Sequence, residues 1–157
     1  MIEQHGSQHH HLLSGCIRLG DAEMPSRLGV IFSQLSQIIQ EQQPEMISIE
    51  QVFVARNAAS ALKLGQARGA AICAAVQHGV GVAEYAPRAI KQAVTGSGAA
   101  NKAQVQHMIC RLLRLSKAPA ADACDALAAA LCHAYSQATL QRLAPLTQRI
   151  PGKARWR

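Results

Sequence analysis

Aromatic residues are scarce in this 157-residue chain, and long apolar runs are missing. Only 3% of the residues are aromatic, although 49% are hydrophobic. A composition so rich in alanine favours close-packed helices on a sheet over an all-β sandwich. Arg68 interrupts the best apolar run, which stays short of the about 20 residues that a membrane-spanning helix needs. A phosphate-binding P-loop is also missing, which argues against a phosphoryl-transfer enzyme acting on nucleotides.

The cysteines form no C-x-x-C pair and are odd in number. Each lies in an apolar or alanine-rich context, as is typical of small buried thiols in a reducing compartment. The N-terminus is polar and has no signal-peptide pattern, so we expect a cytoplasmic protein without a membrane anchor. The tract at residues 9–11 is three histidines, but no further ligands stand nearby and we do not expect zinc there. The five cysteines are Cys16, Cys73, Cys110, Cys124 and Cys132.

Acidic residues are few, and long stretches have almost none. Sixteen Lys and Arg residues stand against nine Asp and Glu residues, for a formal charge of +7. Between Gln51 and Ala121 the chain has nine basic residues and a single acid, Glu84, and after Asp125 it has five basic residues and no acid. Such a distribution favours a polyanionic partner, nucleic acid first. The alternative is a basic protein without such a partner.

Apolar spacing and turn residues predict an α/β chain with parallel crossovers in its second half. We expect one domain over residues 1–136 and a basic, flexible tail over 137–157. The helix at 60–76 should begin with Ser60 as its N-cap. Expected strands are two around a turn at 5–7, the second passing through the LLSGCI segment, then 46–49 and 79–85; expected helices are 24–42, 60–76, 87–94, 101–115 and 122–136.

One carboxylate stands inside an apolar strand. Glu50 follows Ile47 and Ile49 in the ISIEQVF segment, and a lone buried carboxylate costs several kcal/mol unless it is paired or bound to a metal. Asp122 and Asp125 share a helix face. They could simply suit a helix N-terminus. Because the ends of strands form the usual ligand crevice of α/β sheets, the three acids together also suit Mg²⁺ or Mn²⁺.

Four segments carry a family resemblance: SIEQVFVARNAASALKLGQARGAA, IKQAV, GSGAANKAQVQHM and DACDALAAALCHA. From about Ser14 to His133 the chain resembles RuvC-type Holliday-junction resolvases. The resemblance implies an RNase H-like mixed sheet flanked by helices and a homodimer. It also implies an Mg²⁺-dependent endonuclease, with Mn²⁺ as a substitute, that resolves four-way DNA junctions in recombination and repair. Paired symmetric nicks would leave 5′-phosphate and 3′-hydroxyl ends, and the RuvA–RuvB branch-migration complex would be a partner.

The resemblance also implies roles for particular residues. The metal-binding acids would be Glu50, Asp122 and Asp125; the lysines that support catalysis near the scissile phosphate would be Lys91 and Lys102; the DNA-contacting loop would hold Phe53, Arg56 and Asn57. Phe53 would engage an unstacked base, although its sequence context alone favours a core position. Lys102 begins a helix after a glycine-rich turn, where a phosphate meets free backbone N–H groups, but a solvated lysine is the plain alternative. The three histidines near these segments are expected to be surface or packing residues: His78, His107 and His133.

The chain departs from the family pattern at its start. Members carry a first strand with a GIDPG-like motif whose Asp is a fourth acid, and this sequence has no such motif. That strand lies mid-sheet, so two strands should present unpaired edges. We therefore expect the chain as given to be inactive or nearly so. A truncated or misplaced start explains this better than a genuine short protein that binds branched DNA without cutting it. A plain interaction module is the third alternative.

Overall fold

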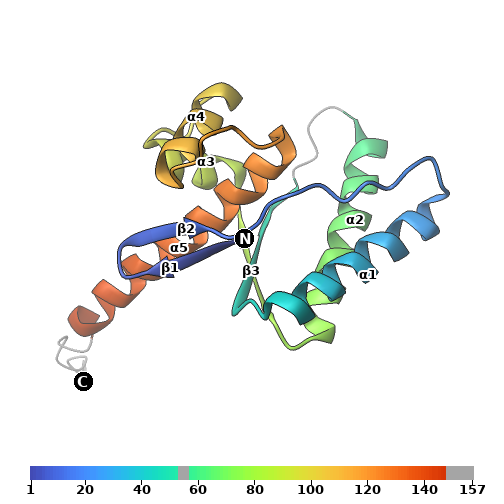
Figure 1. Ribbon diagram of the computed structural model, residues 1–157, viewed down its shortest axis with the longest axis horizontal. Coiled ribbons are helices and arrows are strands. Elements are labelled where there is room, and N and C mark those ends of the chain that lie inside the picture. The colour runs from blue at the N-terminus through green and yellow to red at the C-terminus, as the bar shows by residue number, and fades with distance from the viewer. Residues whose placement is uncertain (53–56, 148–157) are drawn as a thin grey trace, which may run out of the picture.

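The computed structural model describes residues 1–52 and 57–147, which form an α/β arrangement (Figure 1). The α/β class predicted from the sequence is confirmed. The strands are β1 (Ile2–His5), β2 (Gln8–His11), β3 (Met46–Glu50) and β4 (Gly81–Tyr85). The helices are α1 (Met24–Gln42), α2 (Ala58–Gln77), α3 (Pro87–Thr95), α4 (Lys102–Leu112) and α5 (Ala121–Thr147).

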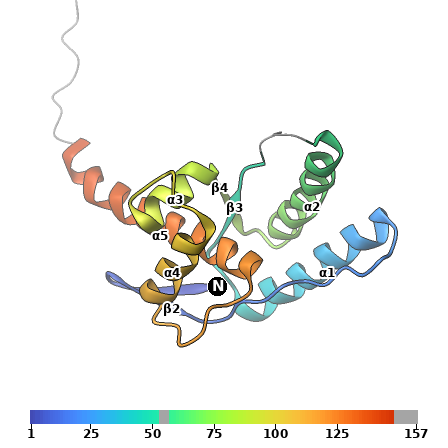
Figure 2. The same cartoon turned by 90° about the horizontal axis from the view of Figure 1, so that it is seen from above.

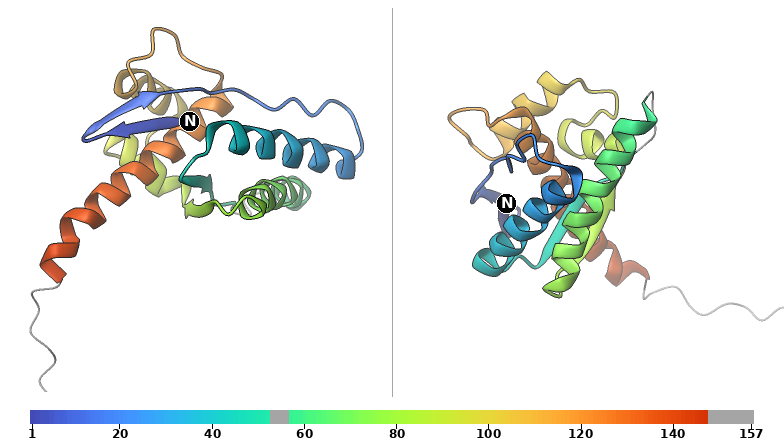
Figure 3. Two further views of the ribbon diagram at one scale, coloured as in Figure 1. Left: turned by 60° about the horizontal axis from the view of Figure 1, so that its bottom comes forward. Right: turned by 90° about the vertical axis from the view of Figure 1, so that its right-hand side faces the viewer.

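The described strands form two separate pairs. β1 and β2 make an antiparallel hairpin in which Ile2 is opposite His11, and β3 and β4 run parallel with Glu50 beside Tyr85. Both antiparallel and parallel pairing occur, as a mixed sheet requires, but within the described residues the two pairs do not join. β1 of the hairpin contacts α5, which also contacts β3 and β4, and the hairpin and the helix diverge from this contact (Figures 2 and 3). One helix thus supports both pairs of strands.

Helices cover the two faces of the β3–β4 pair, with α1 and α2 on one side and α5 on the other (Figure 1). Paired residues of parallel strands project to the same face, and successive residues alternate. Glu84 forms an ion pair with Arg68 of α2. Tyr85 bonds to His133 of α5, so Tyr85 and its register partner Glu50 face α5. The strand pattern therefore turns Glu50 to the α5 side of the sheet, but at the end of β3 its side chain is exposed and not buried as the apolar strand sequence predicted.

The core lies where α3, α4 and α5 meet. Its largest fully buried side chains are Ile109, Leu127 and Leu131. Around them α5 contributes small residues such as Ala128 and Cys132, which let the helices approach closely. The alanine content of the sequence thus serves close packing of α5 against α3 and α4.

Several element boundaries differ from the sequence prediction. β2 ends at His11, so the LLSGCI segment is not a strand. α2 begins earlier than expected because Asn57, not Ser60, is its N-cap and accepts a hydrogen bond from the Ser60 backbone N–H at 3.2 Å. α5 continues to Thr147 rather than ending at residue 136, since most of the residues that follow are good helix formers. The helix at Met24–Gln42 is as predicted, and the division into a 1–136 domain and a tail stays a prediction.

The cysteine prediction was only partly right. Cys124 and Cys132 are buried, as expected, but Cys16 and Cys73 are exposed. Cys16 lies in the irregular segment where a strand was expected, and Cys73 is on an open side of α2. For the described part of the chain, the helices are too short or too polar for any of them to span a bilayer.

Candidate functional site

Glu50 is the last residue of β3, and it lies within electrostatic range of three other charged side chains. Partial burial raises the pKa of the Glu50 carboxyl, and the nearby Asp125 carboxylate raises it further. The ammonium groups of Lys91 and Lys102 act in the opposite direction and lower this pKa. Asp125 of α5, Lys91 of α3 and Lys102 of α4 therefore lie within electrostatic range of Glu50 at the carboxyl end of β3.

Lys102 forms an ion pair with Asp125 in this group. The Lys102 Nζ atom lies 3.6 Å from Asp125 Oδ2, and the two side chains are 80% and 45% exposed. An ion pair so open to water contributes little to stability, about 0–1 kcal/mol. Both groups can therefore exchange this contact for another charged partner at small cost.

The start of α4 is tightly capped beside Lys102. The Asn101 side chain accepts from the Gln104 backbone N–H, and the Gln104 side chain accepts from the Asn101 N–H, each at 2.9 Å. This capping box fixes the first turn of the helix and so the base of the Lys102 side chain. It also occupies two of the N–H groups that an anion at this helix end would otherwise use.

Lys91 is held at the site by the packing of α3. Ile90 and Val94 are buried against the core, which turns the neighbouring Lys91 to the rim. Thr95 Oγ1 donates to the Lys91 carbonyl at 2.9 Å near the end of the helix. Gly96 then ends α3 with φ +78°, a left-handed conformation that glycine adopts without strain.

Asp122 is more exposed to solvent than Asp125. It is exposed in the first turn of α5, whereas Asp125 one turn later is half-buried. Within residues 1–52 and 57–147, no three His, Cys, Asp or Glu side chains gather closely enough to hold a metal ion. A ready-made cluster of Glu50, Asp122 and Asp125 is thus not formed, and the role of Asp122 stays a prediction. Of the two aspartates, only Asp125 is close enough to act on the pKa of Glu50.

The acids present do suit a hard cation. Mg²⁺ binds through one or two carboxylates, keeps several waters and takes further oxygens from a phosphate substrate. After burial, the Asp125 carboxylate is the second cause of the raised pKa of Glu50, and a cation between the two carboxylates would remove this repulsion. The two carboxylates fit this donor chemistry without a third protein ligand.

The predicted DNA-contacting loop is described only at its last residue. Phe53 and Arg56 lie outside the described residues, so their roles stay predictions. Asn57 is exposed and caps α2, which gives it a structural function that the sequence did not suggest. Its amide is engaged locally, at 3.2 Å from the Ser60 N–H.

One polar contact at the site was missed by the sequence reasoning. The Tyr85 hydroxyl and His133 Nδ1 are 2.8 Å apart, which joins β4 to α5. His133 follows Asp125 by eight residues, about two helical turns, and this spacing is the only sequence signal that relates it to the acids. Its partner stands 48 residues earlier, so the pair is recognisable only in three dimensions.

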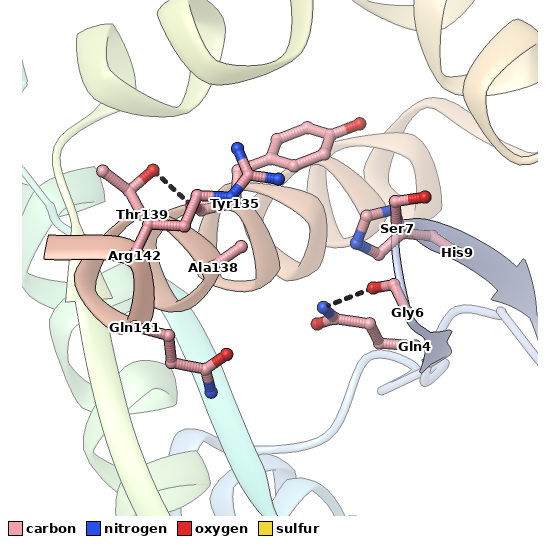
Figure 4. A pocket seen from close by; sticks show the side chains of 9 residues that line it. All are labelled: Gln4, Gly6, Ser7, His9, Tyr135, Ala138, Thr139, Gln141 and Arg142. Carbon is pink, nitrogen blue, oxygen red and sulfur yellow. Dashed lines mark hydrogen bonds between the residues drawn. The ribbon is translucent and has the colours of Figure 1, made fainter. Parts of the chain in front are cut away.

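Two hollows lie away from the acids. A cavity of about 530 Å³ separates the β1–β2 hairpin from α5, with His9 and Ser7 on one side and Tyr135 and Arg142 on the other (Figure 4). A second hollow of about 650 Å³ borders the turn between α3 and α4 next to Lys102. Neither hollow is lined by the predicted carboxylates.

Comparison with known proteins decides the family. The family model described as "Crossover junction endodeoxyribonuclease RuvC" matches residues 1–133. The chain belongs to the RuvC family. Crossover junction endodeoxyribonuclease RuvC of Aliivibrio fischeri (strain MJ11) is 55% identical over 144 residues, 92% of this chain and 83% of the relative. RuvC of Tolumonas auensis is 51% identical over 157 residues, 100% of this chain and 89% of the relative.

Solved structures agree with this assignment. Thermus thermophilus RuvC in complex with Holliday junction substrate matches with a TM-score of 0.83 and 31% identity, over 88% of this chain and 86% of that one. A second solved structure of Thermus thermophilus RuvC matches with a TM-score of 0.79 and 32% identity over the same shares of the two chains. The RuvC-type resemblance and the RNase H-like fold predicted from the sequence are thereby confirmed. The family is one of metal-dependent endonucleases.

A first testable consequence concerns Glu50 and pH. A raised carboxyl pKa stabilises the folded chain fully below the unfolded value of 4.5, and this contribution is lost as the pH rises through the raised folded value. We expect Glu50→Gln, measured by urea unfolding in EDTA, to be more stable than the parent at pH 7 by less than about 1 kcal/mol. At pH 3.5 the two should be equally stable. A variant less stable than the parent at pH 7 would contradict the assigned environment of Glu50.

Proposed function

We propose that this chain recognises four-way DNA junctions and introduces Mg²⁺-dependent nicks that leave 5′-phosphate and 3′-hydroxyl ends. The observation that carries the proposal is the meeting of Glu50 and Asp125 with Lys91 and Lys102 at the end of β3, where the Lys102 Nζ atom is 3.6 Å from Asp125. Carboxylates beside lysines suit a phosphodiester and a hard cation together. The formal charge of +7 and the family membership support a DNA partner.

Each group has a separate task in this proposal. Glu50 and Asp125 hold the cation, joined by Asp122 at the edge of the site. Bound Mg²⁺ would activate a water and stabilise the leaving oxygen. Lys91 and Lys102 attract the phosphodiester, and Asp125 keeps the Lys102 ammonium near the cleavage position until the phosphate replaces this contact. Phe53 stacks on an unpaired base, while Arg56 and Asn57 contact the DNA backbone.

We further propose that the chain acts as a homodimer, because a four-way junction has two symmetry-related strands to cut. On α2, a Cβ atom built at Gly65 or Gly69 would meet nothing within 4 Å in the described residues, so neither glycine is needed for packing against that part of the chain. Leu62 and Leu64 on the same helix are 66% and 56% exposed. These features support a partner subunit on α2. Cooperation with RuvA–RuvB in cytoplasmic recombination and repair completes the proposal.

A second function is favoured by the sparse ligand set: binding of branched DNA with little or no cutting. Within the described residues, no three potential ligands lie close enough together to hold a metal ion, and Asp122 is exposed. The unpaired edges of the two described strand pairs also favour this second function, because they leave β3 less firmly held. We therefore expect junction binding to be retained and nicking to be slow.

One experiment tests both functions. The purified 157-residue chain is mixed with a synthetic four-way junction and, as control, a linear duplex of the same sequence. We expect preferential junction binding in EDTA with a steep dependence on salt, and slow nicking after Mg²⁺ is added. Equal binding to both DNAs would contradict a junction-specific function. Nicking as fast as that of Thermus thermophilus RuvC, measured in parallel, would contradict the impaired activity.

A further inference from the structure

The hydrogen bond between Tyr85 and His133 joins side chains that are 48 residues apart in the sequence. Its oxygen and nitrogen are 2.8 Å apart, and the two rings meet edge to face at 5.9 Å. Apart from ion pairs, it is the only hydrogen bond in the described ranges that joins two side chains more than four residues apart. It is also partly shielded from solvent. A bond of this kind is stronger than an exposed one because water competes less for its partners.

The bond joins α5, which carries Asp125, to β4, the strand that pairs with the Glu50 strand β3. Tyr85 ends β4 and pairs with Glu50 in the strand register, and the Gln51 N–H donates to the Tyr85 carbonyl at 2.9 Å. Tyr85 is therefore fixed relative to Glu50. His133 lies on α5 eight residues after Asp125, about 12 Å along the helix axis. Since a helix is stiff over this length, fixing His133 also fixes Asp125.

Little else on this face of the sheet resists sliding of the helix. The residues that precede Glu50 and Tyr85 on the same face are Ser48 and Ala83, which are small. Small side chains interlock weakly, so their packing sets the spacing of the layers better than the position of α5 along the strands. Burial lowers the pKa of His133, which favours the neutral ring. In the tautomer that carries its proton on Nε2, the ring Nδ1 accepts a hydrogen bond from the tyrosine hydroxyl.

We propose that Tyr85 and His133 are positioning residues that set the separation of the Glu50 and Asp125 carboxylates and thereby the affinity for a divalent cation. This inference rests on the proposed function, because it assumes that these two carboxylates bind a cation. The pair does not contact the cation in this scheme. It acts by locking α5 against β4 at one point behind the acids, so that the carboxylates need not be rearranged when the cation enters.

The test uses Tyr85→Phe, which removes only the hydroxyl group. We expect Mn²⁺ affinity, followed by electron paramagnetic resonance without DNA, to fall about 10-fold, as for other residues that support metal ligands indirectly. The Mg²⁺ concentration for half-maximal nicking should rise by the same factor, with the rate at saturating Mg²⁺ changed less. Junction binding in EDTA should be unchanged.

Two further variants separate positioning from general stability. Tyr135→Phe removes the same group from a different half-buried tyrosine, which lies on α5. The Tyr135 hydroxyl has no hydrogen-bond partner within the described residues. We expect it to leave Mn²⁺ affinity unchanged. His133→Asn keeps an acceptor near the position of Nδ1, so it should retain more affinity than His133→Phe.

The outcomes distinguish this inference from the function on which it rests. Mn²⁺ affinity of Tyr85→Phe within twofold of the parent, or an equal loss in Tyr135→Phe, would overturn the positioning role while leaving the proposed function intact. Equal losses in His133→Asn and His133→Phe would also overturn it. A parent chain that binds no Mn²⁺ would overturn the proposed cation site and this inference with it.

Discussion

Replacing Asp125 by asparagine is expected to lower Mg²⁺-dependent junction nicking by more than about 100-fold, because loss of indirect support for a metal ligand already costs about 10–100-fold. The amide keeps the size of the side chain but removes the charge that opposes Glu50. Mn²⁺ affinity should fall in parallel. Single-turnover reactions with excess protein measure the rate, since even a slow parent accumulates product when every junction is bound.

The same substitution should leave the folded chain and its DNA affinity largely intact. Asp125 is 45% exposed and its contact to Lys102 is 3.6 Å long, so its loss costs about 0–1 kcal/mol of stability. Junction affinity in EDTA should stay the same or rise slightly, since one negative charge near the phosphate disappears. Asp21→Asn, at an exposed position outside the site, is the matched control and should nick at the parental rate. Asp125→Asn nicking within threefold of the parent would exclude Asp125 as a cation ligand.

The sequence located the candidate site along the chain better than it described the geometry. Strand periodicity placed Glu50 at the end of a strand, and the i, i+3 spacing placed two aspartates on one helix face. Those local patterns hold in β3 and α5. What separates Asp122 from Asp125 is tertiary packing, because only the second lies in range of Glu50. Residue spacing carries no information on how far a helix face stands from a strand.

The helix ends and the Tyr85–His133 contact could not be predicted from the sequence, because they too depend on tertiary structure. Both asparagine and serine are good N-caps, so the choice between Asn57 and Ser60 depends on where the chain leaves β3. A histidine after an alanine-rich run reads as surface or packing, and only the fold brings a tyrosine hydroxyl within 2.8 Å of it. The family resemblance, by contrast, rested on long matched segments and carried the fold class correctly.

Replacing Leu131 by alanine is expected to have the largest effect on stability, about 3 kcal/mol within the usual range of 2–5 for a buried leucine. Leu131 is 0% exposed and packs with Ile109 and Leu127 where α4 and α5 meet. Its neighbours are held by two helices and cannot collapse into the space. A domain of this size has only about 5–15 kcal/mol of stability in all, so the loss is a large share.

Leu140→Ala provides the matched control on the same helix. Leu140 is 59% exposed, so its truncation should change stability by less than about 0.5 kcal/mol. Urea unfolding of both variants in EDTA measures the difference without any contribution from bound metal. Because α5 carries Asp122, Asp125 and His133 along with Leu131, we also expect Leu131→Ala to weaken Mn²⁺ binding at temperatures where it is still folded. Equal stability of the two variants would mean that α5 is not the core helix, and the site that depends on its position would lose its support.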